Sequence, residues 1–255
     1  MYEDLTYEVQ DGVGVVTLAR PAVHNALRRQ GYAELEDVVR TTDARVLVVT
    51  GADPSFCSGD DVREIMTGDG PPPDLAADPR ITPAAEALLM TDVPVIAAVN
   101  GAAMGWGMEL ALMADLRVAS ERARFAELFV ERGLCCDVAG LGRLVQLVGR
   151  ERAAELLFTG RRVDAEEALR IGLVSRVVEH DRLMDAALEL ARTIAQRPPL
   201  AVAKLKAGLR EALDPDWREL GRWVSASLAE LFTTEDHREG VTAFLEKRAP
   251  VYRGR

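Results

Sequence analysis

Apolar, β-branched runs alternate with helix-like segments along the first half of the chain. The runs that predict strands lie at residues 13–18, 45–50, 93–99 and 116–119. Between the first two, residues 28–40 place apolar side chains at the spacing of an amphipathic helix. Strands that alternate with helices are typical of an α/β fold. The pattern therefore predicts an α/β protein.

Helical segments dominate the second half of the chain. Asp164 begins the capping-box pattern of a helix that Gly172 would end, and residues 174–178 predict a last short strand. The segments that follow are almost all helical, and a pair of prolines divides them. We interpret residues 1–197 as an α/β core with the ligand site, and residues 198–255 as a helical C-terminal segment.

Residues 93–114 form an apolar run whose one ionisable side chain is Glu109. The run is about as long as a membrane-spanning helix, but a proline and several glycines would break that helix and place Glu109 in hydrocarbon. A buried strand, a glycine-rich turn and a helix that begins at Gly105 or Trp106 fit the run better. We therefore expect no membrane segment, and residues 1–10 are too polar and acidic for a signal peptide.

Glu109 is the first candidate for chemistry. A carboxylate in so apolar a run either lies at a wet end of its helix, paired with the helix dipole, or is buried with a raised pKa. The second arrangement produces a general acid/base that works near neutral pH. Which arrangement applies determines the role of Glu109.

Two turns rich in small residues, 55–61 and 100–107, each connect a strand to a helix. The first N–H groups of a helix have no acceptor within it, and the helix dipole favours negative charge there. If the two turns are neighbours, one N–H from each could bind a single oxygen, as in an oxyanion hole. A dinucleotide-binding fingerprint fails, because Leu110 stands where its third glycine is required.

Composition narrows the class of protein. The chain has 255 residues, 48% of them hydrophobic, and a formal net charge of −10, which argues against non-specific nucleic-acid binding. Three cysteines, Cys57, Cys135 and Cys136, are too few and too clustered for a disulfide framework, which suits the cytoplasm. None of them has metal-ligand spacing with a histidine, so we expect no metal site. Residues 66–80, with four prolines, form either an active-site lid or a surface loop.

Several motifs together resemble the enoyl-CoA hydratase/isomerase (crotonase) family, in the family's order and across essentially the whole chain. They lie at residues 20–27, 56–62, 100–110, 114–119 and 244–248. The resemblance implies a crotonase-like spiral of ββα units with a helical C-terminal trimerisation segment at residues 198–255. It also implies a homotrimer or a hexamer that is a dimer of trimers. No tightly bound cofactor is implied, and coenzyme A would be part of an acyl-CoA thioester substrate.

The same resemblance assigns binding groups. The backbone N–H groups of Asp60 and Trp106 would form the oxyanion hole. Phe244 and Lys247 would meet the adenine-phosphate end of CoA, from a neighbouring subunit, and backbone near Val23 and Asp60 would line its path. For Lys247, a solvated charge at a helix end stays an alternative.

The catalytic carboxylates separate members of the family. Glu109 matches one of the two glutamates of the hydratases, but the position of the second is occupied by Phe129. Asp137 resembles the acid/base aspartate of dienoyl-CoA isomerases, or it is a simple helix N-cap. Glu127 and Glu131 flank Phe129 and could compensate for it, but we expect both to be solvated or ion-paired at the surface.

Three functions follow from this resemblance. The first is an enoyl-CoA hydratase in which Glu109 is the principal acid/base group. The second is an enoyl- or dienoyl-CoA isomerase in which Glu109 and Asp137 move a double bond. The third is a CoA-thioester binding subunit without catalysis. RNA binding, known for some members of the family, is disfavoured by the acidic charge.

Overall fold

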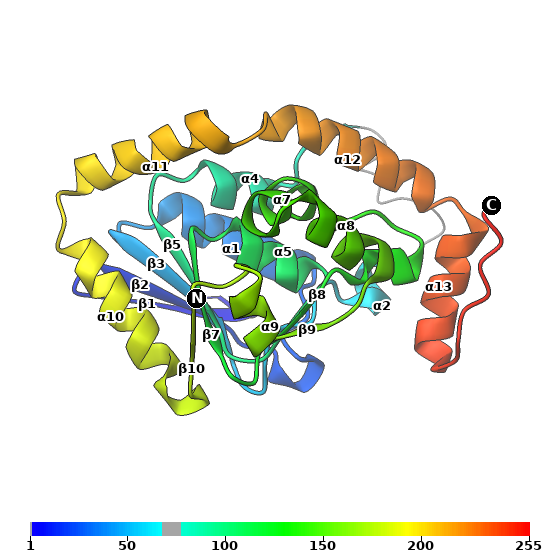
Figure 1. Cartoon of the computed structure of the whole chain (residues 1–255), viewed down its shortest axis with the longest axis horizontal. Helices are drawn as coiled ribbons and strands as arrows, with labels where there is room; N and C mark the ends of the chain where they lie inside the picture. Colours follow the sequence, from blue (N-terminus) through cyan, green and yellow to red (C-terminus); the bar gives the residue numbers. More distant parts are fainter. Residues whose placement is uncertain (1, 68–77) are drawn as a thin grey trace.

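A computed structural model describes residues 2–67 and 78–255, and two sheets organise it (Figure 1). The large sheet has the order β1 (Leu5–Gln10), β2 (Val13–Leu18), β3 (Val46–Gly51), β5 (Val95–Val99), β7 (Leu116–Ser120), β10 (Arg176–Val178). The small sheet has the order β4 (Ser55–Cys57), β6 (Ala102–Met104), β8 (Arg124–Ala126), β9 (Val163–Asp164). Antiparallel pairing occurs between β1 and β2 and between β8 and β9, and the other described pairs are parallel.

Three successive ββα units connect the two sheets. Strands β3, β5 and β7 enter the large sheet, and the strands that follow them, β4, β6 and β8, enter the small one. The helices that complete the units are α2 (Val62–Ile65) with α4 (Pro83–Met90), α5 (Trp106–Met113), and the 3-10 turn η2 (Leu128–Arg132) with α6 (Val138–Leu141). Each unit moves one strand along both sheets. The predicted spiral of ββα units is therefore confirmed.

Helices cover both faces of the large sheet. α10 (Leu183–Ala195) packs on one face, and α1 (Arg29–Thr41), α4 and α5 pack on the other side (Figure 1). All residues of β3 and β5 are buried, as expected of parallel strands with helices on both faces. The remaining helical elements are η1 (Pro21–Val23), α7 (Arg143–Val148), α8 (Arg150–Thr159), α9 (Ala165–Arg170) and η3 (His180–Arg182).

The sequence pattern located most of the long elements within two residues of their ends. It missed β1 and the strands of the small sheet, which have two or three residues each and no measurable period. The cap at Asp164 is confirmed, because its Oδ1 accepts a hydrogen bond from the Glu167 N–H at 2.9 Å. The reciprocal bond of a capping box does not form, because the Glu167 carboxylate pairs with Arg161 instead.

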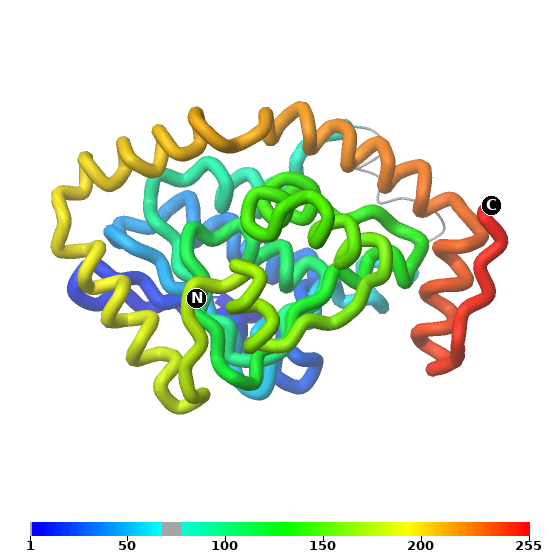
Figure 2. The backbone as a smooth tube through the Cα atoms, in the orientation of Figure 1, coloured from blue at the N-terminus to red at the C-terminus, as the bar shows by residue number. Residues whose placement is uncertain are grey.

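Two of the C-terminal helices run along the top of the molecule, and the last one turns down its side (Figure 2). The three helices are α11 (Pro199–Leu213), α12 (Trp217–Leu231) and α13 (Glu235–Glu246). The Lys206 ammonium ties α11 to the core, since it donates to the Val93 carbonyl at 2.8 Å and to Asp115 at 2.7 Å. Trp217 and Val224 of α12 are buried in the main core. The division at residue 197 falls between α10 and α11 and stays an interpretation. No described helix is long and apolar enough to cross a membrane.

Helix α5 lies at the centre of the spiral and packs very closely on β4. A Cβ added at Gly107 would lie 2.0 Å from the carbonyl oxygen of Cys57, so the helix can approach β4 because residue 107 is glycine. At the other end, the buried Arg117 guanidinium donates to the Ala114 carbonyl at 2.7 Å and to the Leu173 carbonyl at 2.9 Å. These contacts fix both ends of α5.

Gly107→Ala tests this close approach. The added methyl group must displace backbone of β4, so we expect a free energy of unfolding lower by about 1–3 kcal/mol, measured by urea denaturation. Gly208→Ala is the matched control, because its Cβ would meet no atom within 4 Å and α11 would gain about 1 kcal/mol of helix propensity. Equal unfolding midpoints for wild type and Gly107→Ala would contradict the argument.

Candidate active site

The two small-residue turns are neighbours in space. β4 and β6 pair in parallel, with Ser55 opposite Ala102, so both turns leave the small sheet at the same edge. A Cβ placed on Gly59 would lie 3.2 Å from the backbone nitrogen of Trp106. Gly59 and Gly105 both have positive φ, at 94° and 52°, which glycine adopts readily. The geometric condition for a shared anion site is met.

The N–H groups of Asp60 and Trp106 follow these two glycines. No backbone carbonyl of the described residues accepts a hydrogen bond from either. Trp106 is the first residue of α5, where an N–H has no acceptor within the helix and the dipole favours an anion. Neither N–H is therefore used by the backbone of the described residues, and the Asp60 N–H lies near the carboxylate of its own residue.

Two buried asparagines hold these turns in place. The Asn25 Nδ2 donates to the carbonyls of Ala52 and Ser55, each at 2.7 Å. The Asn100 Oδ1 accepts from the Gly51 N–H at 3.3 Å, and its Nδ2 donates to Asp53 at 2.8 Å. The motifs at residues 20–27 and 100–110 thus supply side chains that position backbone.

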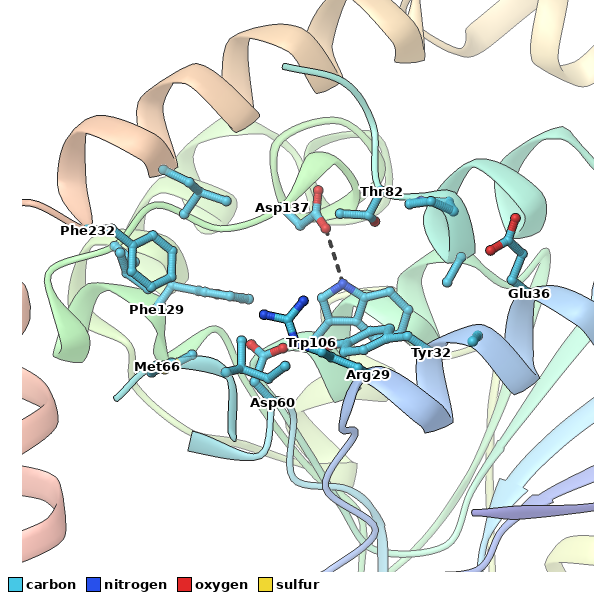
Figure 3. Close-up of a pocket in the computed structure, with 16 residues that line it drawn as sticks. Arg29, Tyr32, Glu36, Asp60, Met66, Thr82, Trp106, Phe129, Asp137 and Phe232 are labelled. Carbon is cyan, nitrogen blue, oxygen red and sulfur yellow. Dashed lines mark hydrogen bonds between the residues drawn. The ribbon is translucent and has the colours of Figure 1, made fainter. Parts of the chain in front are cut away.

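A cavity of about 310 Å³ opens beside the paired turns (Figure 3). Its walls are mainly apolar, with Trp106 and Phe129 on facing sides and Phe232, the C-cap of α12, closing one end. Asp60 and Asp137 also line it. Met66 lies in its wall, but residues 68–77 of the expected lid are outside the described residues. The cavity can hold an apolar chain whose polar end reaches the two turns.

Asp137 fits both of its interpretations. It is the N-cap of α6, where its Oδ1 accepts from the Val138 N–H at 2.7 Å. Its Oδ2 accepts from the Trp106 indole Nε1 at 3.1 Å across the cavity wall (Figure 3). Burial raises the pKa of Asp137, and these two donors partly offset that effect. The carboxyl group is therefore oriented and lies on the cavity surface.

Tyr32 is a site residue that the sequence analysis missed. Its hydroxyl donates to Asp60 at 2.6 Å, and its ring meets Trp106 edge to face with centroids 4.6 Å apart. Burial raises the pKa of Asp60 to about 6, although the Tyr32 hydrogen bond lowers it. The only signal in the sequence was a tyrosine on the face of the first helix that also carries Leu35.

Glu109 is fully buried in the first turn of α5. Both of its carboxylate oxygens lie within hydrogen-bond distance of the Gly140 N–H, at 3.0 and 3.1 Å. Burial raises the pKa of Glu109 well above its usual value, the neighbouring acidic groups Glu127 and Asp137 raise it further, and the Gly140 N–H lowers it. The arrangement with a raised pKa therefore applies. Glu109 is not among the described residues that line the cavity.

The expectation for Glu127 is wrong. Its side chain is 1% exposed, and neither carboxyl oxygen has a hydrogen-bond partner in the structure. Glu127 follows the last residue of β8, which packs inside the spiral, so its side chain turns into the protein. Glu131 is exposed, as expected. Phe129 is buried, and its ring would lie 3.9 Å from a Cβ on Gly105.

The residues expected to meet CoA lie at the surface. Val23 is exposed at the end of η1, and Lys247 is exposed in the left-handed C-cap of α13. Phe244 is half exposed, and the Arg132 guanidinium lies over its ring at 4.6 Å. None of the three lines the cavity. In the part of the chain that the structure describes, no group of His, Cys, Asp and Glu side chains could hold a metal ion.

Known proteins resemble this chain along its whole length. Residues 8–255 match the family described as Enoyl-CoA hydratase/isomerase. A Rhizobium meliloti protein named Probable enoyl-CoA hydratase is 37% identical over 258 residues, 100% of this chain and 99% of that one. The Short-chain-enoyl-CoA hydratase of Clostridium acetobutylicum is 38% identical over 249 residues, 94% of each.

Solved structures of enoyl-CoA hydratases have the same fold as this chain. An enoyl-CoA hydratase from Mycobacterium avium subsp. paratuberculosis has a TM-score of 0.88 at 28% identity, over 99% of this chain and 100% of that one. An enoyl-CoA hydratase/isomerase from Pseudoalteromonas atlantica has a TM-score of 0.86 at 30% identity, over 98% and 100%. The fold is that of the crotonases. The chain belongs to the enoyl-CoA hydratase/isomerase family and is an enzyme of that family.

Tyr32→Phe tests the electrostatics of the cavity wall. Without the hydroxyl, the charged form of Asp60 loses a hydrogen bond, so we expect the pKa of Asp60 to rise above about 6. A ¹³C NMR titration of the Asp60 carboxyl measures it. Tyr7→Phe is the control, because the Tyr7 hydroxyl bonds to Thr42 instead. An unchanged or lower pKa of Asp60 in Tyr32→Phe would disprove the assignment.

Proposed function

We propose that this protein hydrates 2-enoyl-CoA thioesters, with Glu109 as the principal acid/base group. One observation carries the proposal: the turns that hold Asp60 and Trp106 lie side by side, and Glu109 lies one helical turn beyond the second of them. The hydratase names of the relatives support the same reaction.

The proposed chemistry uses both halves of this site. The N–H groups of Asp60 and Trp106 bind the thioester oxygen, on which negative charge develops when water attacks the β-carbon. Such donors contribute roughly 3 kcal/mol each to lowering the barrier. Glu109 removes a proton from the water as the C–O bond forms, and the α-carbon of the enolate then takes that proton. Water thus adds across the double bond, and Glu109 is regenerated.

The proposal extends to substrate binding and location. Backbone near Val23 and Asp60 lines the path of CoA, and Phe244 and Lys247 meet its adenine-phosphate end in an assembled oligomer. An exposed lysine suits a phosphate, and a half-exposed aromatic ring suits a base. No tightly bound cofactor is required for the hydration. The three cysteines are free in the structure, and a cytoplasmic location stays a proposal.

A double-bond isomerase is the second candidate. Asp137 lies on the cavity surface and is oriented by Trp106, whereas Phe129 replaces the second glutamate of the hydratases. With an unsaturated acyl chain in the cavity, one of Glu109 and Asp137 would remove a proton from one carbon and the other would return a proton to another. The oxyanion hole would hold the dienolate between these steps.

Glu109→Gln tests the central assignment. A glutamine keeps the shape but cannot transfer a proton, so we expect kcat for crotonyl-CoA hydration to fall by about 10²- to 10⁴-fold. Binding of a saturated acyl-CoA, measured by calorimetry, should stay within a few fold. Glu131→Gln, at an exposed glutamate, is the matched control. Near-full hydration by Glu109→Gln would end the proposal.

The same preparations distinguish the two candidates. Wild type is assayed for hydration of crotonyl-CoA and for the shift of a 3-enoyl-CoA double bond. If the wild type isomerised the 3-enoyl-CoA but did not hydrate crotonyl-CoA, and if Asp137→Asn lost the isomerisation, the protein would be an isomerase and the hydratase proposal would be wrong.

We also propose that the chain assembles as a homotrimer or a hexamer through its C-terminal helices. Leu205, Leu209 and Leu213 form a stripe along α11 at a spacing of four residues, and each is more than half exposed. Trp223 of α12 is also exposed. An apolar stripe of this kind marks an interaction surface.

Leu205→Glu with Leu209→Glu tests the assembly. Charges on this stripe cannot be buried, so we expect the mass from light scattering to fall from three or six chains to one. Leu169→Glu, at an exposed leucine of α9, is the control and should keep the assembly. A wild-type chain that is monomeric at micromolar concentration, or an unchanged mass in the double variant, would refute the proposal.

A further inference from the structure

Glu127 is the one described residue with two buried carboxyl oxygens that both lack a hydrogen-bond partner. Its position follows from the small sheet. Ala126 pairs with Met104, and its carbonyl accepts a hydrogen bond from the Gly105 N–H at 2.8 Å. The next residue, Glu127, therefore stands beside the start of α5, and its side chain turns into the protein. A carboxylate without a partner is expensive to bury, so its state needs an explanation.

Glu109 and Glu127 differ in one respect that determines where charge can reside. Glu109 lies in the first turn of α5, where the helix dipole favours negative charge, and the Gly140 N–H donates to its carboxylate. Glu127 is the N-cap of the short 3-10 turn η2, but its side chain makes no capping hydrogen bond, and neither of its carboxyl oxygens has a donor. Of the two side chains, Glu109 has the surroundings of an anion and Glu127 those of a neutral acid.

We propose that Glu127 keeps its proton at neutral pH, so that the two buried glutamates carry one negative charge and that charge lies on Glu109. This inference rests on the proposed function, because Glu109 must start as a carboxylate to remove a proton from water. Glu127 acts through Glu109 and touches no substrate. It is a positioning residue, and it supplies the second carboxyl group that Phe129 cannot.

The groups around Glu127 support this distribution of charge. Asp137 faces it from the start of α6, Glu109 from α5, and Cys136 from the loop between η2 and α6. All are acidic or neutral. Burial raises the pKa of Glu127 well above its usual value, and the charge of Asp137 raises it further. An ionised Glu127 would place another charge beside Asp137 and Glu109, with no described cation among these neighbours to compensate.

The proposed state limits activity at high pH. Two interacting carboxyl groups lose their protons in two steps that belong to the pair. After the first step Glu109 is charged and the enzyme is active. After the second step Glu127 is also charged, and its negative charge opposes the enolate that forms at the oxyanion hole. The proposal therefore assigns the alkaline limb of the pH profile to Glu127.

Infrared spectroscopy tests the proton directly and needs no turnover. A protonated carboxyl group has a C=O stretching band that a carboxylate lacks. At about pH 7 we expect Glu127→Gln to lose such a band that the wild type and Glu109→Gln retain. Glu131→Gln is the control and should keep the wild-type band. Loss of the band in Glu109→Gln, but not in Glu127→Gln, would place the proton on Glu109 and overturn the proposal.

The pH profile of kcat/KM tests the consequence. Wild type should lose about tenfold per pH unit above the second ionisation, and Glu127→Gln should lose this alkaline limb. Glu127→Leu is a second variant, because it removes the buried polar group and should raise the melting temperature. The same alkaline limb in wild type and in both variants would overturn the proposal. A wild type without hydratase activity would refute the proposed function, whereas the infrared result would still decide the state of Glu127.

Discussion

The structure depends on the closeness of one helix to one strand. Helix α5 begins against β4 with no room for a side chain between them, since a Cβ on Gly107 would overlap the Cys57 carbonyl. This contact brings the turn after β4 and the turn after β6 together. Because the two strands are parallel neighbours, their turns leave the sheet at one edge, and the N–H groups of Asp60 and Trp106 come to the same place. Backbone packing, rather than a particular side chain, creates the proposed anion site.

The same helix determines the electrostatics of the interior. Its first turn carries Glu109 into the protein, where the Gly140 N–H compensates part of the cost of burial. Its other end is held by Arg117, beside the Asp115 carboxylate that binds Lys206 of α11. The helix that forms the proposed site is thus connected to the helix that carries the exposed leucine stripe. A change in how α11 is anchored would reach the active-site helix through a few direct contacts.

Much of the fold could be predicted from the sequence, because long buried strands and amphipathic helices have a clear period. The ends of β3 and α1 were predicted to within one residue. The N-cap was predicted at the correct residue, since Asp164 accepts the capping hydrogen bond. The small sheet could not be predicted, because strands of two or three residues have no period. The paired turns could be proposed from glycine chemistry, but their closeness depends on the register of β4 against β6, which no local pattern contains.

The wrong and missing predictions of site residues also have a physical origin. Glu127 was expected at the surface because most glutamates are, and its burial depends on the strand that precedes it. Tyr32 was missed because a tyrosine on a helix is ordinarily a packing residue. The hydrogen bond from its hydroxyl to Asp60 depends on the tertiary structure. The charge state of a buried residue can be inferred only when the groups around it are known.

The backbone origin of the anion site has an evolutionary consequence. A point mutation can remove a carboxyl group, but it cannot remove the N–H of Asp60 or Trp106 unless it introduces proline. The proposed acid/base residues Glu109 and Asp137 stand on different elements around that backbone, in α5 and at the start of α6. Either residue can therefore be replaced by mutation while the backbone groups that would stabilise an enolate stay in place. New reactions can then arise when the residues that transfer protons change and the two backbone N–H groups do not.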